Sequence, residues 1–348
     1  MNDHHKTFIA FATLGRFLRE FGKNTSEEAL WNEKLEDAIR LAKHKNGWFN
    51  RENVLFALKS WGDLLTEQKL SAWLSVYQKN VQKNQPKTIA LIMAGNIPLV
   101  GFHDFLSVLI TGHRALIKLS SSDNVLFAFA TSYLIHREPS LKDYILFTEG
   151  KMEGFDAVIA TGSNNTARYF EHYFGKVPNI IRKNRNSVAV LTGNETTEQL
   201  EALGEDIFRY YGLGCRSVAK IFVPEGYDFD ILFKALYKFH PIVKQIKYAN
   251  NYDYNKAVYL MSEFKILDNG FLILKEDERY SSPIASLAYT FYADVEKLKR
   301  TLKNDVEKLQ CVVSKGFSPN EIDFGTSQIP KLSDYADGVD TVDFLLKI

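Results

Sequence analysis

The sequence has 348 residues, more than twice the roughly 150 residues of an average domain, so we expect two domains and an additional segment. Its 45% hydrophobic and 24% charged residues are typical of a globular protein and exclude a disordered, collagen-like or coiled-coil chain. A net charge of +1 provides no whole-chain attraction to nucleic acid, so we expect no nucleic-acid partner.

The two cysteines, Cys215 and Cys311, are too few for a disulfide scaffold or a four-cysteine zinc site, and they fit a reducing cytoplasm. The 25 Phe and 17 Tyr fit either a large aromatic core or an apolar ligand tunnel. No segment is apolar enough for a secretory signal or a membrane span. We therefore expect a cytoplasmic protein without an integral membrane span.

The first 85 residues predict helices. Apolar residues recur at helical spacing from Phe8 to Phe21, which predicts an amphipathic first helix. Thr25 and Glu28 form a capping box before the second helix, and Asn50 can cap the third.

From Lys87 onward, short β-branched runs alternate with helical stretches, which predicts βα units around parallel sheets. Predicted strands lie at 88–94, 115–119, 144–147, 155–161 and 187–191, and a second series lies at 218–223, 271–274, 284–292 and 310–314. The series meet near Gly212-Leu213-Gly214. We expect a helical segment over 1–85, α/β domains over 86–211 and 212–318, and a C-terminal segment over 319–348 that packs back or joins an oligomer interface.

Two common nucleotide-binding motifs are missing, since neither G-x-G-x-x-G after the first strand nor G-x-x-x-x-G-K-[ST] occurs. No Cys/His cluster has metal-ligand spacing either, and the eight histidines are scattered. We therefore expect no metal site.

Cys215 lies in Gly212-Leu213-Gly214-Cys215-Arg216, between a predicted helix and a predicted strand. The glycines allow the backbone to approach a reacting carbonyl, and Arg216 can stabilise a thiolate. A lone intracellular cysteine is also commonly a small core residue, so the residues alone leave a nucleophile and a core role open. Cys311, within an apolar strand, looks like a core residue.

Polar residues follow three predicted strands at their carboxyl ends, where open α/β sheets bind ligands. Asn96 follows the first strand, with Pro98 at the start of a helix, and it is either an oxyanion donor or an ordinary turn residue. Lys118 and the serines from Ser120 close the second strand and open a helix as a candidate anion or ribose site, and Gly162-Ser163 opens a helix after another strand.

These segments, in this order, resemble the aldehyde dehydrogenase superfamily and, within it, the LuxC-type acyl-CoA reductases. The resemblance covers roughly residues 87–314, and the tail at 337–340 is also LuxC-like. It implies two three-layer Rossmann-like α/β domains after an N-terminal helical segment. Residues 86–211 would bind the cofactor, and residues 212–318 would carry the catalytic residue.

The resemblance also implies roles for individual residues. Gly212-Leu213-Gly214-Cys215 is similar to the family segment whose cysteine is the nucleophile, and Asn96 stands where an asparagine holds the substrate oxyanion. The residues similar to those that bind a nicotinamide cofactor are Lys118, Ser120, Gly162, Ser163 and, in a looser match, Glu278.

Two departures from the family pattern bear on the reaction. Arg182 stands where hydrolytic members carry the glutamate that activates water, which favours reduction of an acyl-enzyme over its hydrolysis. Arg182, Lys183 and Arg185 would face coenzyme A phosphates or form a solvated charge run. Ser121 stands where NAD-preferring members often carry glutamate, which favours NADPH while NADH remains open.

We therefore expect an NADPH-dependent reductase that converts a long-chain acyl-CoA or acyl-protein thioester to fatty aldehyde through S-acyl-Cys215. An aldehyde dehydrogenase that oxidises aldehyde to acid, and a cofactor-free cysteine acyltransferase or acyl-binding protein, remain alternatives. The resemblance also implies a homo-oligomer and an acyl-protein synthetase partner that supplies the acyl group.

Overall fold

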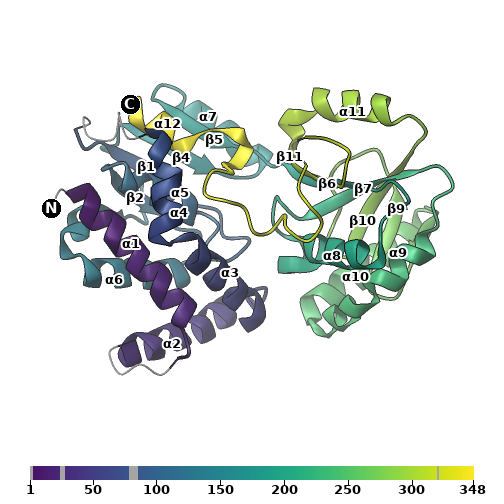
Figure 1. Ribbon diagram of the computed structural model, residues 1–348, viewed down its shortest axis with the longest axis horizontal. Coiled ribbons are helices and arrows are strands. Elements are labelled where there is room, and N and C mark those ends of the chain that lie inside the picture. Colours follow the sequence, from purple (N-terminus) through teal and green to yellow (C-terminus); the bar gives the residue numbers. More distant parts are fainter. Residues whose placement is uncertain (1–2, 24–27, 78–84, 320) are drawn as a thin grey trace. The chain divides into compact units, whose positions relative to one another are not determined.

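The computed structural model describes residues 3–23, 28–77, 85–319 and 321–348, and the chain divides into two compact units. Unit 1 comprises Met1–Lys183 and Lys331–Ile348, and unit 2 comprises Asn184–Pro330 (Figure 1). Each unit contains a largely parallel sheet with helices, which confirms the predicted α/β class. The division lies at residue 183 rather than at 211, because the strand at 186–190 pairs within the second sheet.

The helices that begin unit 1 are α1 (Asp3–Glu20), α2 (Ala29–Lys45), α3 (Arg51–Leu64) and α4 (Glu67–Leu74). The Asn50 side chain caps α3 by accepting a hydrogen bond of 2.8 Å from the Asn53 N–H, as predicted. Glu28 precedes α2 without a side-chain cap, and Thr25 lies outside the described residues.

The sheet of unit 1 is parallel, with strand order β3-β2-β1-β4-β5. Its elements are β1 (Thr88–Ile92), α5 (Phe102–Ile110), β2 (Arg114–Lys118), α6 (Leu126–Arg137), β3 (Ile145–Phe147), β4 (Ala157–Thr161), α7 (Asn164–Phe174) and β5 (Asn179–Arg182). Strands β2 and β3 lie on one side of β1, and β4 and β5 lie on the other. The strand order therefore reverses at β1, which is where open α/β sheets bind ligands at their carboxyl edge.

Alternate residues of β1 face two different clusters of apolar side chains. Ile89 and Leu91 pack into the core formed with the helices, whereas Ala90 packs against Phe170 and Phe174 of α7. The helical core contains many ring contacts among fully buried aromatics, including Phe11, Phe102, Phe105, Phe127 and Tyr133. Much of the high aromatic content of the sequence thus belongs to this core.

The C-terminal residues pack back onto the first helices of unit 1. Trp73 Nε1 donates to the Tyr335 hydroxyl at 2.8 Å, and the Tyr77 hydroxyl donates to Asp340 Oδ2 at 2.5 Å. The hydroxyl groups of Tyr77 and Tyr335 are 2.8 Å apart. Asp340 also caps α12 (Thr341–Leu346), which packs against α5. This network connects the tail at 337–340 to residues more than 250 positions earlier.

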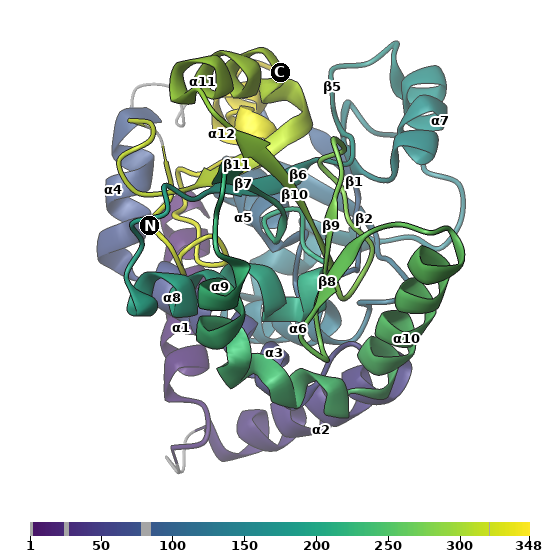
Figure 2. The ribbon, with the colours of Figure 1, turned by 90° about the vertical axis from the view of Figure 1, so that its right-hand side faces the viewer.

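Unit 2 has three layers around a sheet of order β11-β6-β7-β10-β9-β8, in which only the edge strand β8 is antiparallel (Figures 1 and 2). Helices α8 and α9 cover one face, and α11 packs on the other. The elements are β6 (Asn186–Val190), α8 (Thr197–Phe208), β7 (Val218–Pro224), α9 (Phe229–Leu236), α10 (Ile246–Met261), β8 (Ile266–Asp268), β9 (Ile273–Glu276), β10 (Ser286–Tyr292), α11 (Val295–Asn304) and β11 (Leu309–Val313). Within the described ranges, no helix is long and apolar enough to cross a membrane.

A buried carboxyl group connects the loops that follow β1 and β2. Asp123 Oδ2 accepts a hydrogen bond of 2.6 Å from the Leu99 backbone N–H, and Leu99 has a left-handed φ of +57°. In the same loop, a Cβ added at Gly95 would lie 2.6 Å from Ser120 Oγ, so only glycine fits there. The loop that carries Asn96 is therefore held against the loop that carries Ser120.

Burial raises the pKa of Asp123 to about 7, with the Leu99 hydrogen bond opposing the shift. The unfolded carboxyl ionises near pH 3.8, so the stabilising contribution of its neutral folded form is lost as the pH rises toward 7. Asp123→Asn cannot ionise but keeps an oxygen that can accept from Leu99. In urea unfolding, the stability of the variant relative to the wild type should rise by roughly 4 kcal/mol between pH 4 and pH 8. A difference that does not change with pH would contradict a neutral buried Asp123.

Candidate active site

Five of the residues singled out in the sequence lie at the ends of three adjacent strands of unit 1, with Lys118 as the last residue of β2. Ile92 of β1 pairs with Lys118 of β2 and with Ala160 of β4, so the ends of these parallel strands lie side by side. Asn96 follows β1, Ser120 follows β2, and Gly162-Ser163 follows β4. The structure thus brings all five to the carboxyl edge of one sheet, on both sides of the point where the strand order reverses.

Asn96 is exposed in the loop between β1 and α5. The sequence places a helix start at Pro98, but α5 begins at Phe102, because the left-handed Leu99 turns the backbone before the helix. That turn is stabilised by the hydrogen bond from Leu99 to Asp123. Sequence reasoning missed this role of Asp123, which lies 24 residues from Leu99.

Lys118 and Ser120 are half-buried at the end of β2. Lys118 Nζ donates to the Gly150 carbonyl at 3.1 Å, and Ser120 Oγ accepts from the Ser122 N–H at 3.2 Å. These contacts leave an ammonium group and a hydroxyl group at the edge of the sheet. Both are suited to phosphate and ribose oxygens.

Gly162 and Ser163 immediately precede α7. Ser163 Oγ accepts from the Thr166 N–H at 3.2 Å and so caps the helix, as a Gly-Ser pair before a helix predicts. A Cβ added at Gly162 would lie 3.0 Å from the Thr166 Cβ, so a larger residue would be crowded.

In unit 2, Cys215 is exposed in the loop between α8 and β7. The residues before it are unusual, since Tyr210, Tyr211 and Gly212 all have positive φ, at 54°, 58° and 74°. Left-handed conformations at non-glycine residues cost of order 1 kcal/mol or more and are concentrated at functional sites.

Two side-chain contacts hold the backbone around Cys215. Ser187 Oγ of β6 donates to the Cys215 carbonyl at 2.9 Å, and Arg216 Nε donates to the Ser327 carbonyl at 2.5 Å. Arg216, expected to stabilise a thiolate, thus also anchors the loop to the 326–328 segment. The contact from Ser187 has no local sequence signal.

Glu278 is exposed in the segment that leads from β9 to β10. The fully buried Lys220 of β7 holds this segment, because its Nζ donates to the Asp277 and Glu278 carbonyls at 2.8 and 2.9 Å. Burial lowers the pKa of Lys220, while the nearby Glu278 and Asp277 oppose the shift. The position of Glu278 therefore depends on a lysine that the sequence did not indicate.

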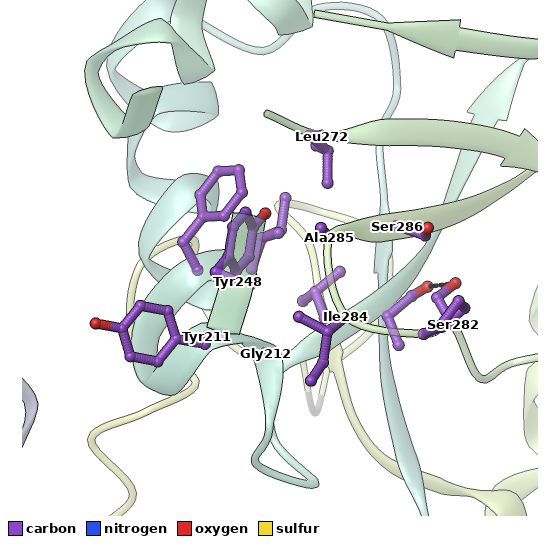
Figure 3. Close-up of a pocket in the computed structure, with 13 residues that line it drawn as sticks. Tyr211, Gly212, Tyr248, Leu272, Ser282, Ile284, Ala285 and Ser286 are labelled. Carbon is purple, nitrogen blue, oxygen red and sulfur yellow. Dashed lines mark hydrogen bonds between the residues drawn. The ribbon is translucent and has the colours of Figure 1, made fainter. Parts of the chain in front are cut away.

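A small pocket lies beside the start of the cysteine loop (Figure 3). Tyr211 and Tyr248 line one side, and Ile284, Ala285 and Ser286 line the other. Its volume of about 30 Å³ suits one or two water molecules rather than a fatty acyl chain.

The basic residues at the end of β5 and directly after it each contact other groups of the protein. Arg182 is buried in an ion pair with Asp104 of α5 and also donates to Thr341 Oγ1 at 3.1 Å. Lys183 pairs with Glu171 at 2.8 Å, and Arg185 donates to the Val306 and Leu309 carbonyls. The expectation that Arg182 faces coenzyme A is therefore wrong, because its guanidinium group is part of the interior of unit 1.

The predicted site residues thus fall into two sets. Asn96, Lys118, Ser120, Gly162 and Ser163 belong to unit 1, whereas Cys215 and Glu278 belong to unit 2. Over the residues that the structure covers, no group of three or more His, Cys, Asp or Glu side chains is arranged to hold a metal ion.

Comparison with solved structures shows the fold of aldehyde dehydrogenases. A putative aldehyde dehydrogenase PutA from Anabaena variabilis matches with a TM-score of 0.57 at 15% identity, over 90% of this chain and 79% of that one. An aldehyde dehydrogenase from Bacillus cereus, solved with NAD+, matches with a TM-score of 0.61 at 12% identity, over 90% and 72%. An NADP-dependent enzyme from E. coli matches with a TM-score of 0.58 at 12% identity, over 94% and 80%.

A search of curated proteins finds no match. In contrast, the family model described as acyl-CoA reductase (LuxC) matches residues 19–236, which include every predicted site residue except Glu278. This match covers more than half of the chain and confirms the resemblance drawn from the motifs. The chain belongs to the LuxC family of acyl-CoA reductases.

Proposed function

We propose that the protein reduces a long-chain acyl thioester, either acyl-CoA or acyl-protein, to the fatty aldehyde through an S-acyl intermediate on Cys215. NADPH is the proposed electron donor, with NADH as the alternative. Two findings support this function. Cys215 is exposed in a strained and anchored loop, and the chain belongs to an acyl-CoA reductase family.

In the proposed first step, the Cys215 thiolate attacks the thioester carbonyl, and the carbonyl oxygen becomes an oxyanion. The Asn96 side-chain amide and the Cys215 backbone N–H donate hydrogen bonds to this oxygen. The tetrahedral intermediate then expels the thiolate of coenzyme A, or of the acyl-carrying protein, and leaves the acyl group on Cys215.

The donor set in unit 1 fits a nicotinamide dinucleotide, since it combines an ammonium group, hydroxyl groups and a helix N-terminus at a strand-order reversal. Lys118, Ser120, Gly162 and Ser163 would hold its phosphates and ribose, and the Glu278 carboxylate would accept from ribose hydroxyl groups. Ser121 is exposed and uncharged, so a 2′-phosphate would meet no like charge there, which favours NADPH. When bound, the reduced cofactor supplies a hydride to the acyl carbon.

After reduction, the thiohemiacetal on Cys215 collapses to release the aldehyde and regenerate the thiolate. The buried ion pair of Arg182 with Asp104 supports reduction over hydrolysis, because the side chain at this position is neither a base nor directed to solvent. We further propose that the enzyme acts in the cytoplasm as a homo-oligomer and receives acyl groups from an acyl-protein synthetase.

Cys215→Ser tests the nucleophile. Because an alcohol at this position does not form the thioester, the variant should lose covalent labelling by radiolabelled palmitoyl-CoA and at least 1,000-fold in aldehyde formation, on the order seen for lost nucleophiles. NADPH fluorescence titration should still give the wild-type dissociation constant, which controls for folding. Full reductase activity in this variant would rule out Cys215 as the nucleophile.

Asn96→Ala tests the oxyanion donor. Removing one such donor typically lowers kcat by about 100- to 1,000-fold, because the interaction strengthens only as negative charge develops. KM for palmitoyl-CoA and the affinity for NADPH should change little. A variant in which KM rises while kcat is retained would identify Asn96 as a binding residue instead.

A further inference from the structure

In unit 2, one buried serine of strand β6 contacts both cysteines of the chain. Ser187 of β6 is completely buried, and its Oγ donates to the Cys215 carbonyl at 2.9 Å. The same Oγ lies 3.0 Å from Cys311 Sγ of the adjacent strand β11. Cys311 is therefore a neighbour of the nucleophile loop and not simply the core residue that the sequence suggested.

The direction of these hydrogen bonds follows from counting protons. A serine hydroxyl carries one proton, and a carbonyl oxygen can only accept, so the proton of Ser187 points to Cys215. Ser187 Oγ must then accept the S–H proton of Cys311. The result is a directed chain from the Cys311 thiol, through the Ser187 hydroxyl, to the Cys215 carbonyl.

The strand pairing is irregular on both sides of Ser187. Ser187 pairs with Val218 and Val188 pairs with Lys220, which leaves Ala219 as an extra residue in β7. On the other side, the register of β11 shifts between Leu309 and Val312, the interval that contains Cys311. β-Bulges redirect side chains and are common beside active sites. These two bulges flank the serine that contacts the nucleophile loop.

The bulge in β7 is itself stabilised. Ser282 Oγ donates to the Ala219 carbonyl at 2.8 Å and accepts from the Ala288 N–H at 2.8 Å. The Ala219 carbonyl thereby has a hydrogen-bond donor despite the bulge. Strand β7 can therefore begin shortly after Cys215 and keep a fixed pairing with β6.

We propose that Ser187 and Cys311 are positioning residues that fix the Cys215 backbone for acyl transfer, an inference that rests on the function proposed above. The hydrogen-bonded chain from Cys311 through Ser187 holds the Cys215 carbonyl. Three residues shortly before Cys215, namely Tyr210, Tyr211 and Gly212, have left-handed φ values and would otherwise relax. The hydrogen-bonded chain thereby fixes the peptide group that follows Cys215 and restricts movement of the residue that carries the proposed nucleophile. The chain requires Cys311 as a protonated thiol, so alkylation or oxidation of Cys311 would interrupt it.

Cys311→Ala and Cys311→Ser form a matched pair for the test, because each leaves Cys215 as the only cysteine. Alanine removes the donor to Ser187, whereas serine restores one. Stopped-flow release of coenzyme A from palmitoyl-CoA would measure acylation of Cys215. We expect Cys311→Ala and Ser187→Ala to be slowed roughly 10-fold and Cys311→Ser to remain within about threefold of wild type, with unchanged NADPH affinity. Equal acylation rates for the two Cys311 variants would overturn the proposal.

Alkylation by iodoacetamide, followed from pH 6 to pH 10, provides a second readout that needs no acyl substrate. The apparent pKa of Cys215 should be higher in Cys311→Ala than in Cys311→Ser, because a loosened loop holds Arg216, the cation expected to stabilise the thiolate, less firmly beside Cys215. If palmitoyl-CoA fails to acylate the wild type while this difference persists, the proposed function fails and the positioning role stands. Identical alkylation profiles would refute the positioning role alone.

Discussion

The hydrogen bond from Ser187 to the Cys215 carbonyl is the constraint on which the loop of the proposed nucleophile depends. An exposed cysteine in a loop has no fixed direction of attack, and here the loop begins with three left-handed residues that need tertiary support. Pairing of β6 with β7 places Ser187 opposite the start of β7, and bulges on both neighbouring strands flank it. The geometry of the loop is therefore specified by the sheet rather than by the loop sequence.

Unit 1 uses a comparable arrangement at its own sheet edge. Asp123 holds the left-handed Leu99, and Gly95 allows Ser120 to approach the loop that carries Asn96. The candidate oxyanion donor and the candidate cofactor residues are thus connected by contacts between two loops. In unit 2, Lys220 fixes the segment of Glu278 in the same way, through backbone carbonyls. In each case a buried polar group from another element holds the backbone near an exposed candidate site residue.

The sequence predicted local structure better than it predicted long-range pairing. Every predicted strand is present with ends within two residues of the observed ones, because β-branched runs bounded by turn residues specify strands locally. The short strands β5 and β8 and helix α10 carried no comparable signal. The division between the units was misplaced because the assignment of the strand at 186–190 to a sheet depends on its partners, which are distant in sequence. For the same reason, the burial of Arg182 against Asp104 and the contacts of Asp123, Ser187 and Cys311, which span 24 to 124 residues, escaped prediction.

A two-step mass measurement tests whether Cys215 takes up an acyl group and whether that group is then reduced. Palmitoyl-CoA would be added to the protein without cofactor, followed by NADPH, with the intact mass recorded after each step and the released product identified. We expect one added palmitoyl group, located on the peptide that contains Cys215, and its loss as hexadecanal only after NADPH is added. An unmodified protein after the first step, or release of palmitic acid without NADPH, would contradict this expectation.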